Sequence, residues 1–345
     1  MVTEVPTLAQ QVSRLYEIIA GYHGTHLLEI GRAVGFWEAI TAVPGLTAEG
    51  LAERLGTDRF YTDIFCRTAF SFGLLQRHGQ GWGMAPHFDQ ILGTPQATFY
   101  LGRAARVHML VGEDYRGYVQ RFRDVSPVPY QAHGDAFMQE IAEGLKTLPR
   151  IFLDFVLPKL PSIRSRLEGG ARVLDVGCGG GWAVVQIAER FPRTHCVGID
   201  IEPHSIELAQ TLIRARGLTD RCEARVVSAD TMVEEAAYDV ATSFLVIHEI
   251  APESKPSAFA AVARALITGG SFVIFDEAYP ETDGEMQSMP TSFAALAQWY
   301  ELTWGNRVNT RTELHKLCKG AGLRVAEETT FSRFHIIVAN KAEES

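Results

Sequence analysis

Apolar and polar residues follow two different patterns along the chain, and the change between them falls near residue 170. Before that point, apolar side chains recur at the spacing of an α-helix, as in Leu15, Ile18 and Ile19. From Ala171 onward, short apolar runs alternate with helical segments up to the end of the chain. This alternation predicts a mostly parallel sheet that is covered by helices on both faces.

Seven strands are expected in this second part. The apolar runs predict strands over residues 172–176, 196–200, 223–227, 239–244, 271–276, 324–329 and 334–339. The last two are too close in sequence for a crossover helix, so we expect an antiparallel hairpin. The prediction is a Rossmann-like, seven-stranded α/β domain over residues 169–345.

The first hundred residues predict a smaller module that is mainly helical. Helices are expected over residues 8–40, 48–55 and 59–75, followed by two short extended runs around a glycine turn at 75–84. Thr47 suits the N-cap of the second helix, and Thr57 or Asp58 that of the third. Helix, turn, helix and hairpin are the elements of a winged helix. We therefore predict an all-α or winged-helix domain over residues 1–100.

A helical connector is expected over residues 101–168, where aromatic residues are frequent and prolines interrupt the pattern. The aromatic residues are Tyr115, Tyr118, Phe122, Tyr130, Phe137, Phe152 and Phe155. For most of them, packing in an ordinary core is the simplest interpretation.

Composition narrows the kind of protein. The chain has 345 residues, of which 46% are hydrophobic, so it can form two domains with cores of their own. Its net charge of −9 disfavours binding to nucleic acids or anionic membranes, which requires a basic surface. Residues 1–100 contain six arginines, no lysine and nine acidic residues, which disfavours a DNA-reading winged helix.

The expected location is the cytoplasm. The five cysteines form no C-x-x-C pair and suit a reducing compartment. The sequence shows no signal peptide at its start and no apolar run of membrane-spanning length.

The most informative motif follows the first strand of the α/β domain. There the sequence Asp-Val-Gly-Cys-Gly-Gly-Gly opens a helix, and Asp200 ends the next apolar run. Glycine lets a backbone pass close to a ligand. An acid about 20 residues further on accepts hydrogen bonds from a ribose diol. The pattern therefore predicts a nucleoside-containing cofactor.

The glycine spacing distinguishes between two kinds of cofactor. A dinucleotide site requires G-x-G-x-x-G. The position of the third glycine is Trp182 when counted from Gly177 and Val184 when counted from Gly179. A pyrophosphate site therefore fits this sequence poorly.

The D-x-G-x-G-x-G form resembles motif I of the class I S-adenosylmethionine (SAM) methyltransferases. The resemblance implies SAM as the cofactor and a set of binding residues: Asp175, Gly177, Gly179, Gly181, Asp200, Ile201, Asp230, Thr231 and Phe244. In this comparison Asp175 holds the methionine end, Asp200 the ribose and Asp230 the adenine amino group. Gly181 would allow tight helix–strand packing.

The N-terminal module is similar to the dimerisation domain of natural-product O-methyltransferases and their bacterial relatives. This similarity implies a homodimer through residues 1–100. It also implies a small-molecule methyl acceptor, with part of the 101–168 segment lining the acceptor pocket.

Candidate catalytic residues follow the fourth strand. His248 and Glu249 leave the sheet at the carboxyl ends of the strands, where ligands of α/β sheets bind. An imidazole suits the removal of a proton from an acceptor, so His248 is expected to act as a general base or to orient the acceptor. The alternative is a histidine that caps the next helix. Glu249 either orients His248, acts itself or is solvated.

Further candidates lie after the fifth strand. Asp276 and Glu277 end that strand and face the same edge of the sheet. Beyond them, the candidates for contact with the acceptor are Trp299, Tyr300, Trp304 and Arg307, with core packing and a surface arginine as the simpler alternatives for each residue taken singly. Arg307 would pair with a substrate carboxylate. Some members of the family that this chain resembles hold a metal with two histidines and an acid. No metal is expected here, because the chain has no histidine between His248 and His315 to serve as the second ligand, and a carboxylate-rich site of Glu249, Asp276 and Glu277 is the alternative.

These observations favour a SAM-dependent methyltransferase that acts on a small metabolite, most simply at oxygen. Carbon and nitrogen acceptors stay open, as does another SAM-assisted reaction on the same fold. A SAM-sensing DNA-binding regulator is the remaining alternative, and the acidic N-terminal module counts against it.

Overall fold

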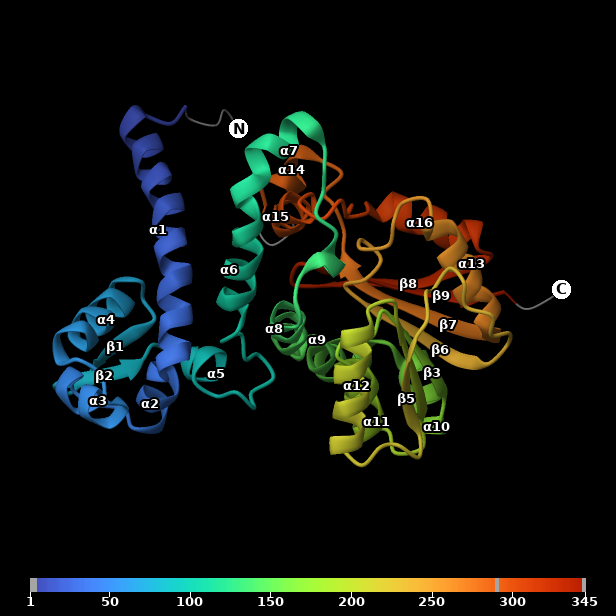
Figure 1. Cartoon of the computed structure of the whole chain (residues 1–345), viewed down its shortest axis with the longest axis horizontal. Coiled ribbons are helices and arrows are strands. Elements are labelled where there is room, and N and C mark those ends of the chain that lie inside the picture. Colours follow the sequence, from blue (N-terminus) through green and yellow to red (C-terminus); the bar gives the residue numbers. More distant parts are fainter. Residues whose placement is uncertain (1–4, 289–291, 343–345) are drawn as a thin grey trace. The chain divides into compact units, whose positions relative to one another are not determined.

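The computed structural model describes residues 5–288 and 292–342. The chain divides into two compact units, Met1–Glu113 and Asp114–Ser345. Figure 1 gives the path of the chain through each unit. Within the described ranges, no helix has the length and apolar character needed to cross a membrane.

The first unit contains helices followed by a short antiparallel hairpin. Its elements are α1 (Leu8–Val34), α2 (Phe36–Ala42), α3 (Ala48–Leu55), α4 (Arg59–Ser71), β1 (Leu75–His78), β2 (Gly81–Met84), α5 (Phe88–Leu92) and α6 (Ala104–Asp114), which ends at the boundary with the second unit. The predicted Thr47 cap is present, and Asp58 rather than Thr57 caps α4. α4 ends before residue 75 because Gly73 adopts a left-handed conformation with φ of +72°. The elements match those expected of a winged helix, and that assignment stays a prediction.

The core of the first unit lies around α2. Trp37, Ile40 and Leu51 are completely buried, and the Trp37 ring packs 5.2 Å from that of Phe65. In contrast, the first half of α1 presents a long apolar surface to solvent within this unit. Its exposed residues include Leu15, Ile18, Ile19 and Tyr22.

The second unit is an α/β domain. Its strands are β3 (Arg172–Val176), β4 (His195–Asp200), β5 (Cys222–Val226), β6 (Tyr238–Phe244), β7 (Leu266–Glu277), β8 (Leu323–Phe331) and β9 (Phe334–Lys341). Before the sheet come α7 (Tyr118–Asp124), α8 (Asp135–Leu145), α9 (Thr147–Ile151), the π-helix η3 (Phe152–Val156), the short η4 (Leu157–Lys159) and α10 (Pro161–Gly169). Between and after the strands lie α11 (Trp182–Arg190), α12 (Pro203–Ala215), α13 (Lys255–Ala265), α14 (Asp283–Met286), α15 (Ser292–Glu301) and α16 (Arg311–Gly320).

The sheet has the strand order β5-β4-β3-β6-β7-β9-β8. The first five strands are parallel, and β9 pairs antiparallel with both β7 and β8. The predicted fold class, the seven strands and the terminal hairpin are thus confirmed. β7 starts at Leu266, before its predicted start at 271, because a register shift near Tyr238 extends its pairing with β6.

Apolar residues fill both faces of this sheet. One core cluster includes Val173, Val240 and Phe275, and the other includes Leu174, Ala241 and Ile274. Neighbouring residues of each strand therefore point to opposite faces, as expected for a sheet covered on both sides. Polar side chains are placed where the strands end, and that edge carries the candidate site.

Candidate active site

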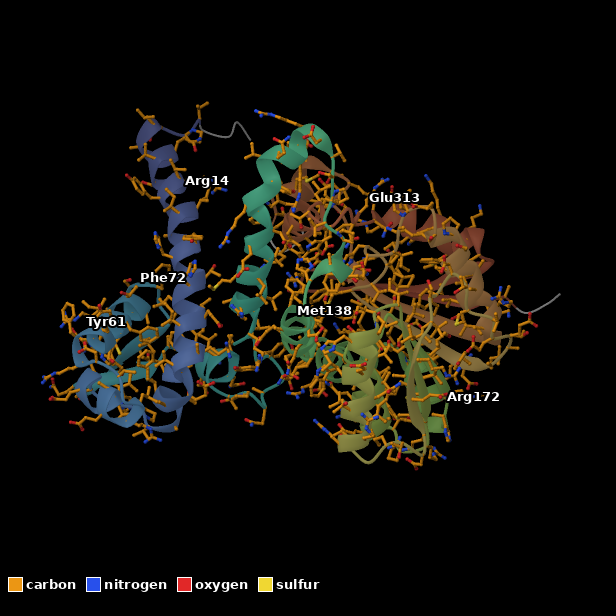
Figure 2. All side chains as sticks on the ribbon, in the orientation of Figure 1. Arg14, Tyr61, Phe72, Met138, Arg172 and Glu313 are labelled. Atoms are coloured by element: carbon orange, nitrogen blue, oxygen red, sulfur yellow. The ribbon has the colours of Figure 1, made fainter. Side chains whose placement is uncertain are left out.

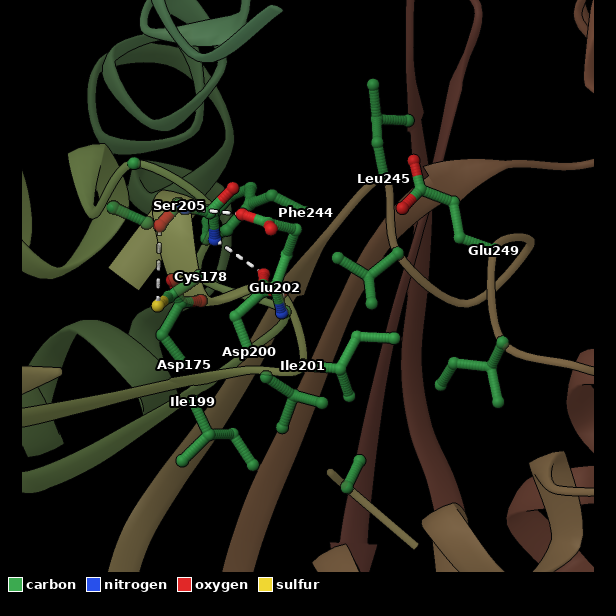
Figure 3. Close-up of a pocket in the computed structure, with 18 of the residues that line it drawn as sticks. Asp175, Cys178, Ile199, Asp200, Ile201, Glu202, Ser205, Phe244, Leu245 and Glu249 are labelled. Atoms are coloured by element: carbon green, nitrogen blue, oxygen red, sulfur yellow. Dashed lines mark hydrogen bonds between the residues drawn. The ribbon is translucent and has the colours of Figure 1, made fainter. Parts of the chain in front are cut away.

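A cavity of about 420 Å³ lies at the carboxyl ends of β3, β4 and β6. This volume is within the range of small-molecule sites, about 300–1,000 Å³. Of the residues predicted to form the site, the cavity is lined by Asp175, Gly177, Gly179, Asp200, Ile201, Asp230, Phe244 and Glu249. Figure 3 shows several of these side chains gathered at the ends of the strands.

The glycine turn after β3 brings the backbone close to the cavity. Gly177 has φ of +67°, and a Cβ placed there would lie 2.4 Å from Cγ1 of Val246. Gly179 also has positive φ, at +49°, although a Cβ there would meet open space. Glycine is therefore required at Gly177 by both conformation and space, and at Gly179 by conformation.

Gly181 does not line the cavity. Its φ is +78°, and an added Cβ would lie 2.8 Å from the Cβ of Ala209 on α12. Its predicted role in helix–strand packing is therefore wrong. Gly181 is the N-cap residue of α11, and it lies close to the neighbouring helix α12.

Asp200 is held in place by the backbone around it. Its Oδ2 accepts a hydrogen bond from the N–H of Gly179 at 2.9 Å, and its Oδ1 accepts one from the N–H of Glu202 at 2.9 Å. Burial raises its pKa, and these backbone hydrogen bonds oppose that rise. A carboxylate has about four acceptor positions, so Asp200 retains acceptor capacity for a ligand in the cavity.

Asp175 lies deeper than Asp200. Its side chain is 2% exposed, and Oδ1 accepts a hydrogen bond from Oγ1 of Thr242 at 2.7 Å. Burial raises the pKa of Asp175 to about 7, against the opposing effect of this hydrogen bond. A cation bound in the cavity would favour the ionised form.

Asp230 and Thr231 were predicted together but have different positions. Asp230 lies at the rim of the cavity, where a hydrogen bond from the Ser228 hydroxyl lowers its pKa. Thr231 is exposed, does not line the cavity, and donates its hydroxyl to the carbonyl oxygen of Ser228 at 3.3 Å. Thr231 therefore does not contribute to the cavity wall, and its predicted cofactor contact stays a prediction.

His248 forms a buried pair with Asp276. Its Nδ1 lies 2.6 Å from Oδ1 of Asp276, and only 6% of the residue is exposed. Asp276 also accepts hydrogen bonds from the backbone N–H groups of Ile247, at 2.9 Å, and Glu277, at 2.7 Å. These contacts fix the orientation of the imidazole.

The charge of His248 is set by the carboxylates around it. Burial by itself would lower its pKa, but Asp276, Glu301 and Glu249 outweigh burial and raise it to about 10. The Nε2 atom lies 3.8 Å from Oε1 of Glu301. His248 is therefore an imidazolium at neutral pH. It does not cap a helix, since α13 begins at Lys255 and has Ser254 as its N-cap.

Glu249 is the predicted catalytic residue that faces the cavity (Figure 3). Glu249 is an exposed residue, but its side chain reaches into the cavity, where protein atoms and other acids surround the carboxylate. Burial raises its pKa to about 8, although the positive charge of His248 opposes the rise. Glu249 therefore exchanges its proton near physiological pH.

Two buried acids, Glu277 and Glu301, lie near His248. Glu277 is 2% exposed and has the Nε of Arg333 at 3.1 Å, and burial raises its pKa to about 7. Glu301 is 3% exposed and accepts a hydrogen bond from the Asn306 amide at 2.8 Å. Burial also raises the pKa of Glu301. The sequence analysis missed Glu301, and its signal was one acid at the end of an otherwise apolar helix.

None of the four residues predicted to contact the acceptor lines the cavity. Trp299 packs against Tyr118, whose hydroxyl donates to the Trp299 carbonyl oxygen. Trp304 donates its indole N–H to Asp114 at 2.8 Å. Arg307 extends to the surface and pairs with Glu313.

Tyr300 differs from these three residues because it lies among the acids. Burial raises its pKa, and so do Glu277 and Glu301. The part of the cavity wall that these four residues were predicted to form comes instead from α8 and the segment before it, including Tyr130 and Met138. Met138 is labelled in Figure 2.

Among the residues that the structure describes, no three histidine, cysteine or acidic side chains are grouped in a way that would hold a metal ion.

Comparisons with known proteins agree with this geometry. Residues 173–270 match the family model described as a methyltransferase domain. The chain is 24% identical to 3-hydroxy-5-methyl-1-naphthoate 3-O-methyltransferase of Streptomyces sahachiroi, over 92% of this chain and 91% of that protein. For several other curated relatives, the chain spans only between 5% and 40% of their length.

Solved structures show the same fold over the whole chain. A putative O-methyltransferase from Nostoc punctiforme has a TM-score of 0.76 at 15% identity, with 98% of this chain and 100% of that chain covered. Human N-acetylserotonin methyltransferase in complex with SAM has a TM-score of 0.71 at 15% identity, with 99% of each chain covered. The chain therefore has the class I SAM methyltransferase fold. Within that fold it contains a methyltransferase domain at residues 173–270.

Proposed function

We propose that this protein is a SAM-dependent methyltransferase that acts on a small-molecule acceptor, most simply at oxygen. The observation that carries the proposal is the charge of the cavity. The described residues that line it include Asp175, Asp200, Glu202, Asp230 and Glu249, but no lysine, arginine or histidine. Such a cavity favours a cationic ligand. An oxygen acceptor is supported by the relative from Streptomyces sahachiroi, which matches almost the whole chain.

The residues present fit SAM. Gly177 and Gly179 bring backbone without side chains to the cavity wall, and a Cβ on Gly177 would collide with Val246. Asp200 has acceptor capacity for a ribose diol, and Asp175 and Glu249 also line the cavity, where a bound cation favours their ionised forms. When bound, SAM supplies a methyl group on a positively charged sulfonium. Asp175 then holds the methionine end, Asp200 the ribose and Asp230 the adenine amino group.

Glu249 is assigned the removal of the acceptor proton. It faces the cavity, whereas His248 does not line it and is already protonated at neutral pH. His248 is assigned to stabilising the Glu249 carboxylate through its positive charge, with Asp276 holding the imidazole. This division reverses the roles expected from the sequence.

The proposal predicts that the preference for SAM over S-adenosylhomocysteine (SAH) increases with pH. Only SAM carries the sulfonium, which favours the ionised form of Glu249. That carboxyl has a raised pKa of about 8, so at lower pH SAM binding must release its proton. The affinity ratio should rise by up to about tenfold per pH unit below pH 8 and level off above it.

Titration calorimetry with SAM and SAH, in buffers of different ionisation enthalpy, measures both the ratio and the released proton. Glu249→Gln should remove the part of this pH dependence that lies near pH 8 and leave the part near pH 7 that Asp175 contributes. Glu253→Gln, at an exposed acid four residues further on, should leave it unchanged. A ratio that is flat across this pH range in the wild type would contradict the role of Glu249.

A homodimer is the proposed assembly. Leu15, Ile18 and Ile19 are 57%, 68% and 45% exposed on α1, and a second copy of this chain would cover them. Leu27, further along the same helix, packs instead in the core of its own unit. The cytoplasmic location stays a prediction.

Analytical ultracentrifugation at micromolar concentration should show a dimer. Ile18→Glu should give a monomer, because it would bury a charge in the interface at a cost of several kcal/mol. Glu17→Ala, a change at the neighbouring position, should leave the dimer intact. A monomeric wild type would reject this assembly.

A further inference from the structure

A second cavity, of about 440 Å³, lies in the α/β unit away from the proposed cofactor site. Its walls come from the η3–η4 segment, from α10, and from the end of α11 with the loop that follows. These segments lead into the first residues of β3 and β4, so the cavity lies at the amino ends of the strands. Arg172, labelled in Figure 2, marks the start of β3. The proposed SAM site is at the opposite edge of the sheet.

Three arginines from separate parts of the chain line this second cavity: Arg164, Arg190 and Arg193. Arg164 pairs with Glu168 at 2.7 Å, and Arg190 lies 3.4 Å from Asp154. Both arginine side chains are more than half exposed, and ion pairs of that kind are worth only about 0–1 kcal/mol. An anionic ligand can therefore replace these partners at small cost.

Arg193 is held differently from the other two. Its guanidinium donates to the backbone carbonyl oxygen of Glu168, and its Cβ packs beside Gly170. That carbonyl orients the side chain without neutralising its charge. A guanidinium in this state offers paired donors that match a carboxylate or a phosphate.

The floor of the cavity is apolar and rigid. Leu153, Leu157 and Phe191 are each less than a tenth exposed, and Pro158 and Pro192 border them. Leu153 belongs to the π-helix η3, an uncommon element that occurs frequently at functional sites. Because only a small fraction of each of these side chains is exposed, the apolar part of a ligand must be small or flat.

We propose that this cavity binds an organic anion, in which a carboxylate or phosphate is attached to a small apolar group. The anionic group would contact Arg190 and Arg193, and the apolar group would lie on Leu153, Leu157 and Phe191. The cofactor cavity does not compete for such a ligand, because its described lining carries several carboxylates and no lysine or arginine. The proposal does not depend on the proposed methyltransferase activity.

The test uses the full chain and three probes: phenyl phosphate, inorganic phosphate and phenol. Binding is measured by calorimetry and by NMR shift changes of the protein. Phenyl phosphate should bind saturably and at least about tenfold more tightly than either fragment, because both parts of the cavity contribute. Benzoate and benzyl alcohol repeat the comparison with a carboxylate, which identifies the preferred anionic group.

Arg190→Gln and Arg193→Gln should each weaken phenyl phosphate binding by about tenfold or more, as expected for loss of a charge-assisted hydrogen bond. Arg324→Gln, at an exposed arginine on β8 outside this cavity, is the matched control and should not change it. Circular dichroism verifies that each variant is folded. Equal binding of phosphate and phenyl phosphate, binding unchanged in both cavity variants, or no saturable binding would each overturn the proposal.

Discussion

Replacing Asp200 by alanine should weaken SAM binding by about 10- to 150-fold, which corresponds to about 1.5–3 kcal/mol for a hydrogen bond to a charged group. The change removes the carboxylate that is assigned to the ribose. It also removes the acceptor for the N–H groups of Gly179 and Glu202, which hold the two loops of the cavity together. Titration calorimetry with SAM measures the loss.

Asp200→Asn separates the two contributions. The amide oxygen can accept from one of the two N–H groups, while its NH₂ group would face the other. Binding by this variant should therefore fall between wild type and Asp200→Ala. Asp220→Ala, at an exposed acid beyond α12, is the control and should bind SAM normally. Unchanged affinity in Asp200→Ala would remove this residue from the site.

The fold could be predicted from the sequence because its strands carry strong local signals. β3 has the predicted bounds, and the predicted bounds of β4, β5 and β6 begin one residue late. β3 and β6 are buried along almost their whole length, and apolar residues form the majority in both. The start of β7 was missed because it depends on pairing with β6 across a register shift. The sequence of β7 alone does not indicate that pairing.

The cofactor side of the site was also predictable, because its residues are close together in sequence. Asp175 lies near the end of β3, Gly177 and Gly179 lie on the turn that follows, and Asp200 is the last residue of the adjacent strand β4. Gly181 and Thr231, at the border of this group, do not line the cavity, which depends on the direction in which each residue points. Gly181 approaches Ala209, which is far along the chain, so its contact depends on the packing of two helices.

The acceptor side could be predicted less well because it is built by tertiary contacts. Trp304 and Trp299 resembled pocket residues by composition, but their partners are Asp114 and Tyr118, nearly 200 residues earlier. The state of His248 depends on Asp276 and Glu301, which come from different elements. Its position after β6 was visible in the sequence, whereas the charge around it required the assembled sheet.

The relation between His248 and Glu249 gives the prediction that best separates their roles. Glu249→Gln should lower kcat by about 10²- to 10⁴-fold at every pH, as expected when a general base is removed. His248→Gln should also lower kcat near neutral pH, but for another reason. The positive charge of His248 lowers the pKa of Glu249, so its loss should raise that pKa further. Because Glu249 must be ionised to accept a proton, the rising limb of the pH–rate profile should move to higher pH, and activity should recover partly in alkaline solution.

If His248 were the base, the effects of the two substitutions on kcat would be reversed. His248→Gln would then lose its rate at all pH values, and Glu249→Gln would retain most of its turnover. An acceptor found by label transfer from methyl-labelled SAM in cell extract supplies the assay. His195→Gln, at an exposed histidine at the start of β4, is the control for the substitution itself. The direction in which the rising limb moves therefore decides which residue takes the proton, because only a base other than His248 can recover its rate when His248 is absent.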